Sequence, residues 1–221
     1  ETPEVTMIMT IEGGSMVFGN DKLKKLGIAE MTANMLNEGT KNFTTEQISA
    51  ELEKLGSNIS FSAGKSSSTV RISCLKKNLD ATLKLLEEKL LNPGFREEDF
   101  KLAKKQYKAN IKDEETNANA IAGKMFTYSL YGNTIMGMQP TTKSVDNVEL
   151  ADVKEYYANY YSPSVTNLVI AGDISEKDVL QKIEFLNKWQ AKEVTILPVV
   201  EPVAPTEPRF YIYNKALAPS S

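Results

Sequence analysis

Few residues in this chain could do chemistry, and histidine is absent from all 221 positions. Imidazole is the usual base that activates a serine or cysteine nucleophile, and it is the commonest nitrogen ligand of catalytic zinc. Hydrolases of the serine–histidine and cysteine–histidine classes would therefore have no base in this sequence. One thiol, the hydroxyls and the carboxylates remain as candidates.

The thiol belongs to Cys74, which alternates with Arg71 and Ser73 in the segment VRISCL. This alternation predicts that Cys74 lies on the buried side of a strand, where it packs in the core. A single cysteine supports neither a disulfide framework nor a thiolate metal cluster.

The carboxylates and hydroxyls do not assemble a site by spacing either. Glu97-Glu98 and Glu114-Glu115 are adjacent pairs, and adjacent positions on a helix point apart. The segment GKSSS at 64–68 lacks the spaced glycine and the helix entry of a phosphate loop. An enzyme with its own non-metal chemistry is therefore the weakest of three functional hypotheses.

The segment that organises the chain is 26–40, LGIAEMTANMLNEGT. Apolar residues at three- and four-residue intervals predict one amphipathic helix, and Glu30, Ala33 and Asn34 lie beside its buried stripe. Gly39 follows the last periodic residue, where a left-handed glycine would close the helix. The stripe consists of Ile28, Met31, Thr32, Met35 and Leu36.

This segment resembles the metal-binding helix of the pitrilysin/insulinase family of zinc peptidases, which includes the mitochondrial processing peptidases. The family pattern is Gly-x-Ala-His-x-x-Glu-His-Met-Leu-x-x-Gly-Thr. Glu30 and Asn34 stand where the pattern has its two histidine ligands, and Ala33 stands where it has the glutamate that activates water. The positions that match are Gly27, Ala29, Met35, Leu36, Gly39 and Thr40.

The resemblance also locates the remaining positions of the metal motif. Asn110 falls where the family has its glutamate ligand, and Ala103 falls at a second glutamate position on the same helix. Glu30, Asn34 and Asn110 would form an all-oxygen site with one carboxylate, whereas zinc prefers nitrogen and sulfur. The resemblance therefore implies no catalytic residue, no metal and no cofactor. The alternative is that these polar residues border a solvated cleft.

The order of the remaining elements predicts an α+β fold with a mostly antiparallel sheet packed on helices. Strands are expected near 5–11, 58–63, 69–75, 165–171 and 209–214, with 64–68 as a hairpin link. Helices are expected from Thr44, from Asn78, over 97–115, through 121–130, over 150–161 and from Ser175 to Trp189.

Later segments resemble the same family in the same order, among them LLNPGFREEDF, DVKEYYANYYSP and NLVIAGDI. The resemblance implies a peptidase-like domain over 1–197 that lacks the family's first strand. A proline-rich linker over 198–208 and the start of a second, similar domain over 209–221 complete the expected organisation.

Composition limits the partners. The net charge is −3 and no block of lysine or arginine stands out in the sequence, so nucleic acid is not an implied partner. No apolar run approaches the roughly 20 residues that span a bilayer, so no transmembrane segment is expected. Because the sequence enters a strand almost at once, a periplasmic or secreted protein with its leader trimmed is one interpretation of its compartment.

Two functional hypotheses follow from the resemblance, and the sequence does not separate them. In the first, the chain is the non-catalytic subunit or half of a zinc peptidase, which pairs with an active one and helps to enclose extended peptides. In the second, it is a binding or assembly module with no proteolytic role.

A peptide would lie on the strand at 58–63, where active relatives present an edge strand. Ile59 and Phe61 alternate with Ser60 and Ser62, which predicts an apolar row on the core and a polar row facing the cleft. Main-chain pairing at such an edge depends little on the sequence of the peptide, so a non-catalytic chain could still bind extended peptides. The competing interpretation is that a neighbouring loop covers this edge.

Overall fold

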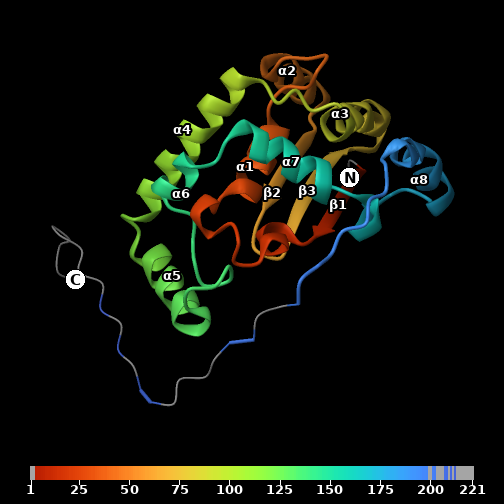
Figure 1. The fold of residues 1–221 in the computed structure, drawn as a ribbon. Helices are drawn as coiled ribbons and strands as arrows, with labels where there is room; N and C mark the ends of the chain where they lie inside the picture. The colour runs from red at the N-terminus through yellow and green to blue at the C-terminus, as the bar shows by residue number, and fades with distance from the viewer. Residues whose placement is uncertain (1–2, 199–200, 203–206, 209, 211, 213–221) are drawn as a thin grey trace.

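The computed structural model describes residues 3–198, 201–202, 207–208, 210 and 212. A four-stranded antiparallel sheet lies at its centre in the order β2-β3-β1-β4 (Figure 1). The strands are β1 (Glu4–Glu12), β2 (Asn58–Ala63), β3 (Ser67–Leu75) and β4 (Thr166–Gly172). The α+β class with an antiparallel sheet is confirmed.

The alternation in β1 sets which face of the sheet is buried. Val5, Met7, Met9 and Ile11 are at most 2% exposed, and the residues between them are partly exposed. Cys74 continues this buried row on β3, opposite Val5, as its alternation predicted. Burial of one face by apolar side chains fixes the strand register, because a shift by one residue would turn the row to solvent.

The hairpin between β2 and β3 is tighter than predicted. The main-chain N–H of Gly64 donates to the carbonyl of Ser67 at 2.9 Å, so only residues 65–66 form the turn. Ser67 and Ser68, which were expected in the link, instead belong to β3, and Ser68 is buried.

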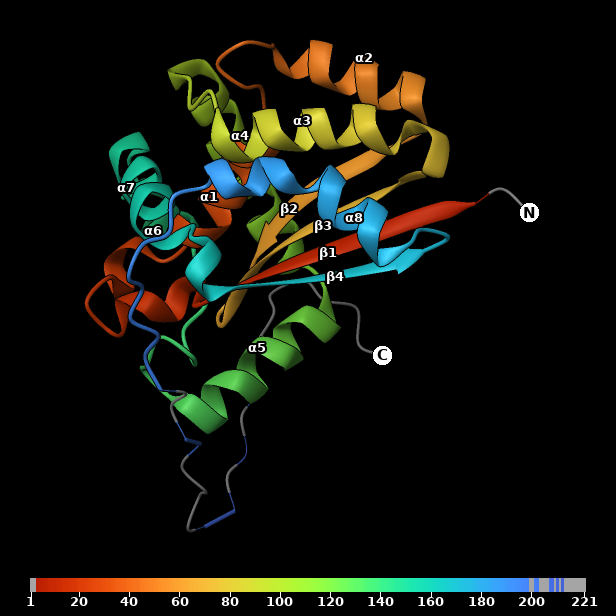
Figure 2. The same cartoon turned by 90° about the vertical axis from the view of Figure 1, so that its right-hand side faces the viewer.

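Helices cover one face of the sheet, as Figure 2 shows for α2, α3 and α8, while α7 packs on α1. Their burial follows the predicted stripes: on α3, for example, Leu79, Leu83, Leu86 and Leu90 are at most 4% exposed. None of the helices among the described residues has the length and apolarity to span a membrane. The helices are α1 (Ile28–Asn37), α2 (Thr45–Leu55), α3 (Leu79–Leu91), α4 (Glu97–Glu114), α5 (Ala118–Tyr131), α6 (Thr142–Asp146), α7 (Leu150–Tyr160) and α8 (Glu176–Lys182).

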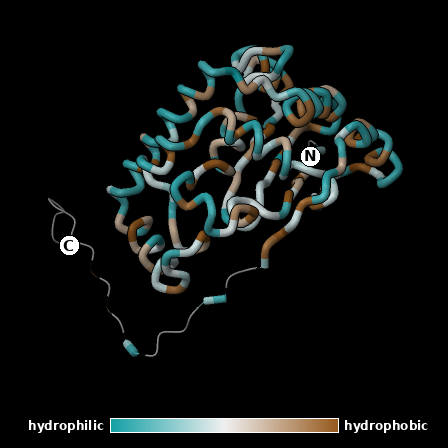
Figure 3. Tube along the Cα trace, viewed as in Figure 1, coloured by the Kyte–Doolittle hydropathy of each residue, from teal (hydrophilic) through white to brown (hydrophobic). Residues whose placement is uncertain are grey.

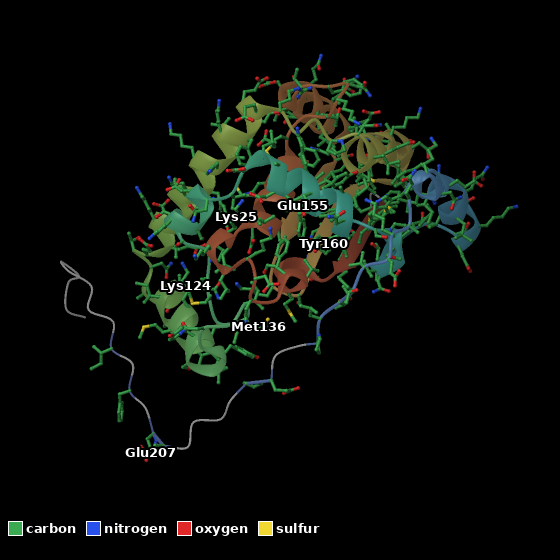
Figure 4. The ribbon with its side chains drawn as sticks, in the orientation of Figure 1. Lys25, Lys124, Met136, Glu155, Tyr160 and Glu207 are labelled. Atoms are coloured by element: carbon green, nitrogen blue, oxygen red, sulfur yellow. The ribbon has the colours of Figure 1, made fainter. Side chains whose placement is uncertain are left out.

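Short 3-10 helices complete the connections, at Gly14–Phe18, Leu23–Lys25, Lys76–Asn78, Pro163–Val165 and Glu184–Lys188. The second of them ties α7 to the segment before α1, because the Lys25 ammonium lies 2.8 Å from the Asp152 carboxylate. Lys25 and Tyr160 of α7 are labelled in Figure 4, and the Tyr160 ring packs on Phe18 with 5.6 Å between centroids.

The helix around the motif is shorter than 26–40, and Gly39 does not close it as predicted. Gly27 is the residue in the left-handed region, with φ 112°, just before the first turn. The last turn ends at Asn37, and Gly39 has no positive φ. A Cβ at Gly39 would lie 2.6 Å from Arg96 Nη1 and 2.7 Å from the Phe43 carbonyl, so the position needs glycine for close packing.

The helices near the C-terminus and α5 lie at the margins of the core. The predicted helix from Ser175 to Trp189 is interrupted, because α8 ends at Lys182 and a 3-10 helix carries the chain to Lys188. The Ser175 hydroxyl accepts from the Asp178 N–H as the expected cap. Figure 2 shows α5 on the other side of the sheet from α2 and α3, and none of its residues is buried.

The C-terminal expectations are mostly outside the described residues. The described parts of the predicted linker, Pro198, 201–202 and 207–208, have no regular secondary structure. The predicted strand over 209–214 and the start of a second domain over 209–221 lie outside the described residues, apart from Phe210 and Ile212.

Candidate functional site

The candidate site begins on α1, which carries the three motif positions Glu30, Ala33 and Asn34. Ala33 is 1% exposed, so it belongs to the core and is not merely beside it. Asn34 and Glu30 are partly exposed as residues. The Ala33 side chain is a methyl group, so it cannot act as an acid or a base toward a substrate.

The Glu30 carboxyl end is buried although part of the residue is accessible. Its Oε2 has no hydrogen-bond partner among the described residues. Burial raises the pKa of this carboxyl above its usual range, and Lys65 lies close enough to oppose part of that rise. The Lys65 ammonium itself donates to the Met138 carbonyl, and burial lowers its pKa.

The motif positions on α4 do not complete a metal site. Helices α1 and α4 pack together, but Ala103 is a buried core residue. Asn110 is exposed, and its Oδ1 accepts from Gln106 at 3.0 Å, whereas no hydrogen bond joins it to Glu30 or Asn34 within the described residues. One carboxylate whose pKa is raised, with two neutral amides and a nearby ammonium, does not fit zinc.

Among the described residues, no group of three or more histidine, cysteine, aspartate or glutamate side chains lies so that it could hold a metal ion. Glu30, Asn34 and Asn110 offer one carboxylate and two amide carbonyls, which is a poor donor set for a zinc ion that would activate water.

The C-terminal end of α1 is held by a buried cation that sequence reasoning missed. Lys89 of α3 is 2% exposed, and its Nζ donates to the carbonyls of Leu36, Asn37 and Glu38 at 3.1, 2.8 and 3.0 Å. These carbonyls would otherwise lack a partner at a helix end. Burial lowers the pKa of Lys89 to about 8.

The turn before α4 is hydrogen-bonded to Gly39 and Thr40, which follow α1. Gly94 N–H donates to the Gly39 carbonyl at 3.1 Å, and Arg96 Nη2 donates to the Thr40 carbonyl at 2.6 Å. Phe95 adopts φ 44°, which is strained for a residue with a side chain, and its ring packs on Tyr157 at 5.3 Å. The Gly39-Thr40 pair of the family pattern therefore serves as the docking point of this turn.

The predicted peptide-binding strand, β2, lies at an edge of the sheet. Ile59 and Phe61 are 6% and 3% exposed and join the core, while Ser60 is partly exposed and Ser62 is exposed. Successive strand residues point to opposite faces, so Ser60 and Ser62 lie on the face opposite the core, and that they face a peptide-binding cleft stays a prediction.

The edge of β2 is partly covered, and the cover comes from a helix and not from a loop. Asn37 Nδ2 donates to the Phe61 carbonyl and the Phe61 N–H donates to Asn37 Oδ1, both at 2.8 Å. The sequence carries no signal for this contact, because an asparagine at a helix end is equally suited to bonding water.

A basic groove lies apart from these residues, along α4. It has a volume of about 490 Å³, and the outer face of α4 is largely hydrophilic in Figure 3. Lys104 Nζ donates to the carbonyls of Asp146 and Val148, so part of this charge holds α6. The sequence does carry this signal, because intervals of three and four residues place the lysines on one face of a helix, although they form no contiguous block: Lys101, Lys104, Lys105, Lys108 and Lys112.

Two family models match the chain. The model described as insulinase (peptidase family M16) matches residues 1–139, and the one described as the peptidase M16 inactive domain matches residues 147–220. The interval between the two matches contains α6, and all the motif positions lie within the first match.

Curated relatives agree with the family models. The non-peptidase homolog YmxG of Helicobacter pylori is 25% identical over 187 residues, which cover 82% of this chain and 42% of that protein. A probable mitochondrial-processing peptidase subunit beta of Arabidopsis thaliana is 22% identical, with 82% and 34% covered. The chain thus spans less than half the length of these relatives.

Solved structures share the fold. A crystal structure of a peptidase M16 inactive domain from Pseudomonas fluorescens superposes with a TM-score of 0.80 at 22% identity, over 93% of this chain and 50% of that one. The periplasmic protease PqqL from Escherichia coli gives a TM-score of 0.72 at 21% identity, over 92% and 23%.

Proposed function

Since the chain belongs to the insulinase family of peptidases, family M16, we propose that it is a non-catalytic subunit or half of such a peptidase, which helps to enclose and bind extended peptides. The peptide would be held by main-chain pairing along β2, with no chemistry from this chain. The catalytic groups would come from an active subunit or half of the same family.

The observation that carries the proposal is the edge position of β2. In an antiparallel pair, alternate residues direct their main-chain groups toward the partner strand or away from it. The Gly64–Ser67 hydrogen bond fixes the alternation, so the main-chain groups of Ser60 and Ser62 point toward β3, while those of Ile59 and Ala63 point away from β3, where no described strand pairs with them. These outward N–H and carbonyl groups are what an added strand needs.

The domain organisation is part of the proposal. Residues 1–197 would form one peptidase-like unit, 198–208 a linker and 209–221 the beginning of a second unit. Two such units around one chamber would leave this chain as a wall of the chamber, and β2 would lie on its inner surface.

Peptide binding by two variants at one position tests the role of β2. Ala63→Pro removes an outward N–H without removing a bond to β3, and Ala63→Val keeps the N–H as the matched control. We expect the full-length protein to bind extended peptides about tenfold more weakly in the proline variant, the effect of one or two lost hydrogen bonds. Unchanged affinity in a folded Ala63→Pro protein would exclude this strand as the platform.

A binding or assembly module with no proteolytic role remains the second candidate, because Asn37 already occupies the middle of this edge. An intact His-x-x-Glu-His sequence in the same polypeptide or the neighbouring reading frame favours the first candidate. Copurification of the full-length protein with an active sister, and a cleavage assay with and without chelator, separates the two.

A further inference from the structure

The contact between Asn37 and Phe61 imitates one residue of a β-strand. A carboxamide carries one carbonyl acceptor and an N–H donor in the same plane, as a peptide group does. Both are used on the same residue, with Nδ2 donating to the Phe61 carbonyl and Oδ1 accepting from the Phe61 N–H. Two bonds of 2.8 Å to one residue are the pattern that a paired strand would make there.

Phe61 is the middle one of three outward-facing positions on β2. The hydrogen-bond pattern of the hairpin directs the main-chain N–H and carbonyl groups of Ile59, Phe61 and Ala63 away from β3. The contact with Asn37 confirms that orientation for Phe61. A peptide that pairs with the whole edge needs all three positions. Asn37 therefore occupies the centre of the surface that an added strand would cover.

The main chain of Asn37 is fixed while its side chain is accessible. Lys89 Nζ holds the Asn37 carbonyl at 2.8 Å from the buried side of the helix. The residue itself is exposed, so its amide can exchange Phe61 for water by a side-chain rotation. A fixed backbone with a movable amide keeps the competing group at the edge at high effective concentration.

We propose that Asn37 is an intramolecular competitor that regulates access of extended peptides to the β2 edge. This inference rests on the proposed peptide-binding function. An incoming peptide gains its two central hydrogen bonds only after the Asn37 amide has left Phe61. Peptide affinity in the native protein is therefore lower than the open edge would give.

Three asparagine variants of the full-length protein test the competitor. Asn37→Ala removes the amide, and Asn37→Asp keeps the shape and one acceptor but has no donor for the Phe61 carbonyl. Asn147→Ala is the matched control, because Asn147 is also exposed and donates its amide to a main-chain carbonyl, that of Lys24 at 3.0 Å. Binding of extended peptides of β-forming composition is measured for each, together with amide hydrogen exchange at Phe61 without peptide.

We expect peptides to bind about tenfold more tightly to Asn37→Ala, less so to Asn37→Asp, and with native affinity to Asn147→Ala. The Phe61 amide should exchange faster in Asn37→Ala alone. If native protein and Asn37→Ala bind equally, the competitor is excluded while the peptide-binding function stands. If neither binds, the proposed function fails and the competitor fails with it. Binding by Asn37→Ala only would support a closed native edge.

Discussion

The polar groups at the two ends of α1 differ in how they are hydrogen-bonded. Near its start, the Glu30 carboxyl end is buried and its Oε2 has no hydrogen-bond partner in the part of the chain that the structure describes, and Ala33 offers no polar group at all. At its last turn, three carbonyls are bonded to one buried ammonium, that of Lys89. The end that would carry chemistry is incomplete, whereas the end that supports the fold is held by hydrogen bonds from Lys89.

This difference explains why the family pattern is matched in part. The matching positions are all buried, and they pack or dock: Gly27, Ala29, Met35, Leu36, Gly39 and Thr40. Their roles depend on neighbours within this chain and need no metal. A fold of this kind can therefore stand without the residues that bind zinc.

The largest expected effect on stability comes from a substitution that removes the hydrogen bonds at the C-terminal end of α1. Lys89→Met keeps the aliphatic stem but leaves three carbonyls without their donor, two of them only partly accessible to water. We expect the free energy of unfolding to fall by about 3 kcal/mol, measured by urea denaturation. Lys84→Met, at an exposed position of the same helix, should change it by less than about 0.5 kcal/mol. Equal effects would show that Lys89 does not support α1.

A smaller loss is expected at the docked turn. Arg96→Met removes the bonds from the guanidinium to the carbonyls of Thr40 and Phe43. Because the side chain is 30% exposed, we expect a loss of about 1.5 kcal/mol in the free energy of unfolding. Arg71→Met, at an exposed site on β3, is the control, and a similar loss there would contradict the role of the turn.

The incomplete end should respond to pH. Burial raises the pKa of Glu30 in the folded protein, so the folded state retains this proton to higher pH than the unfolded state does. Its stabilising contribution is full below the unfolded pKa and is lost as pH rises through the folded pKa.

Glu30→Gln should therefore be more stable than the native protein at neutral pH, by about 1 kcal/mol, the typical desolvation loss of a buried polar group. The difference should shrink as pH falls toward 4. Denaturation curves at several pH values measure it, and Glu53→Gln controls for the loss of one carboxylate at an exposed position. A variant that is less stable at neutral pH would mean that the Glu30 charge is stabilising.

The smallest expected effect is that of metal removal. Because Glu30, Asn34 and Asn110 do not fit zinc, chelator should change the free energy of unfolding by less than about 0.5 kcal/mol. Metal analysis of the purified protein should find substoichiometric zinc. A tight one-to-one zinc complex that is lost in Glu30→Ala would contradict the statement that these residues do not bind zinc. Both ends of α1 would then have bonded polar groups.

Periodicity predicted the fold well and the site only in outline. The alternation of Val5 to Ile11 and the leucine stripe of α3 are local signals, and both are confirmed. The role of Gly39 depends on Arg96, 57 positions later in the sequence, and no local pattern encodes that approach. The sequence gives no sign of the role of Lys89, since its burial depends on where the end of α1 lies in space. The edge position of β2 came from the resemblance, whereas its contact with Asn37 is visible only in three dimensions.

The Asn37–Phe61 contact also has a consequence for the chain during synthesis. Asn37 and Phe61 are 24 residues apart, whereas Lys89 is 52 residues from Asn37, so the first contact closes the shorter loop. The amide can therefore cover the centre of the β2 edge before the residues that fix α1 have emerged. An edge strand with open main-chain groups is a template for pairing with another chain, so we expect the same side chain also to lower the tendency of β2 to pair with a second polypeptide.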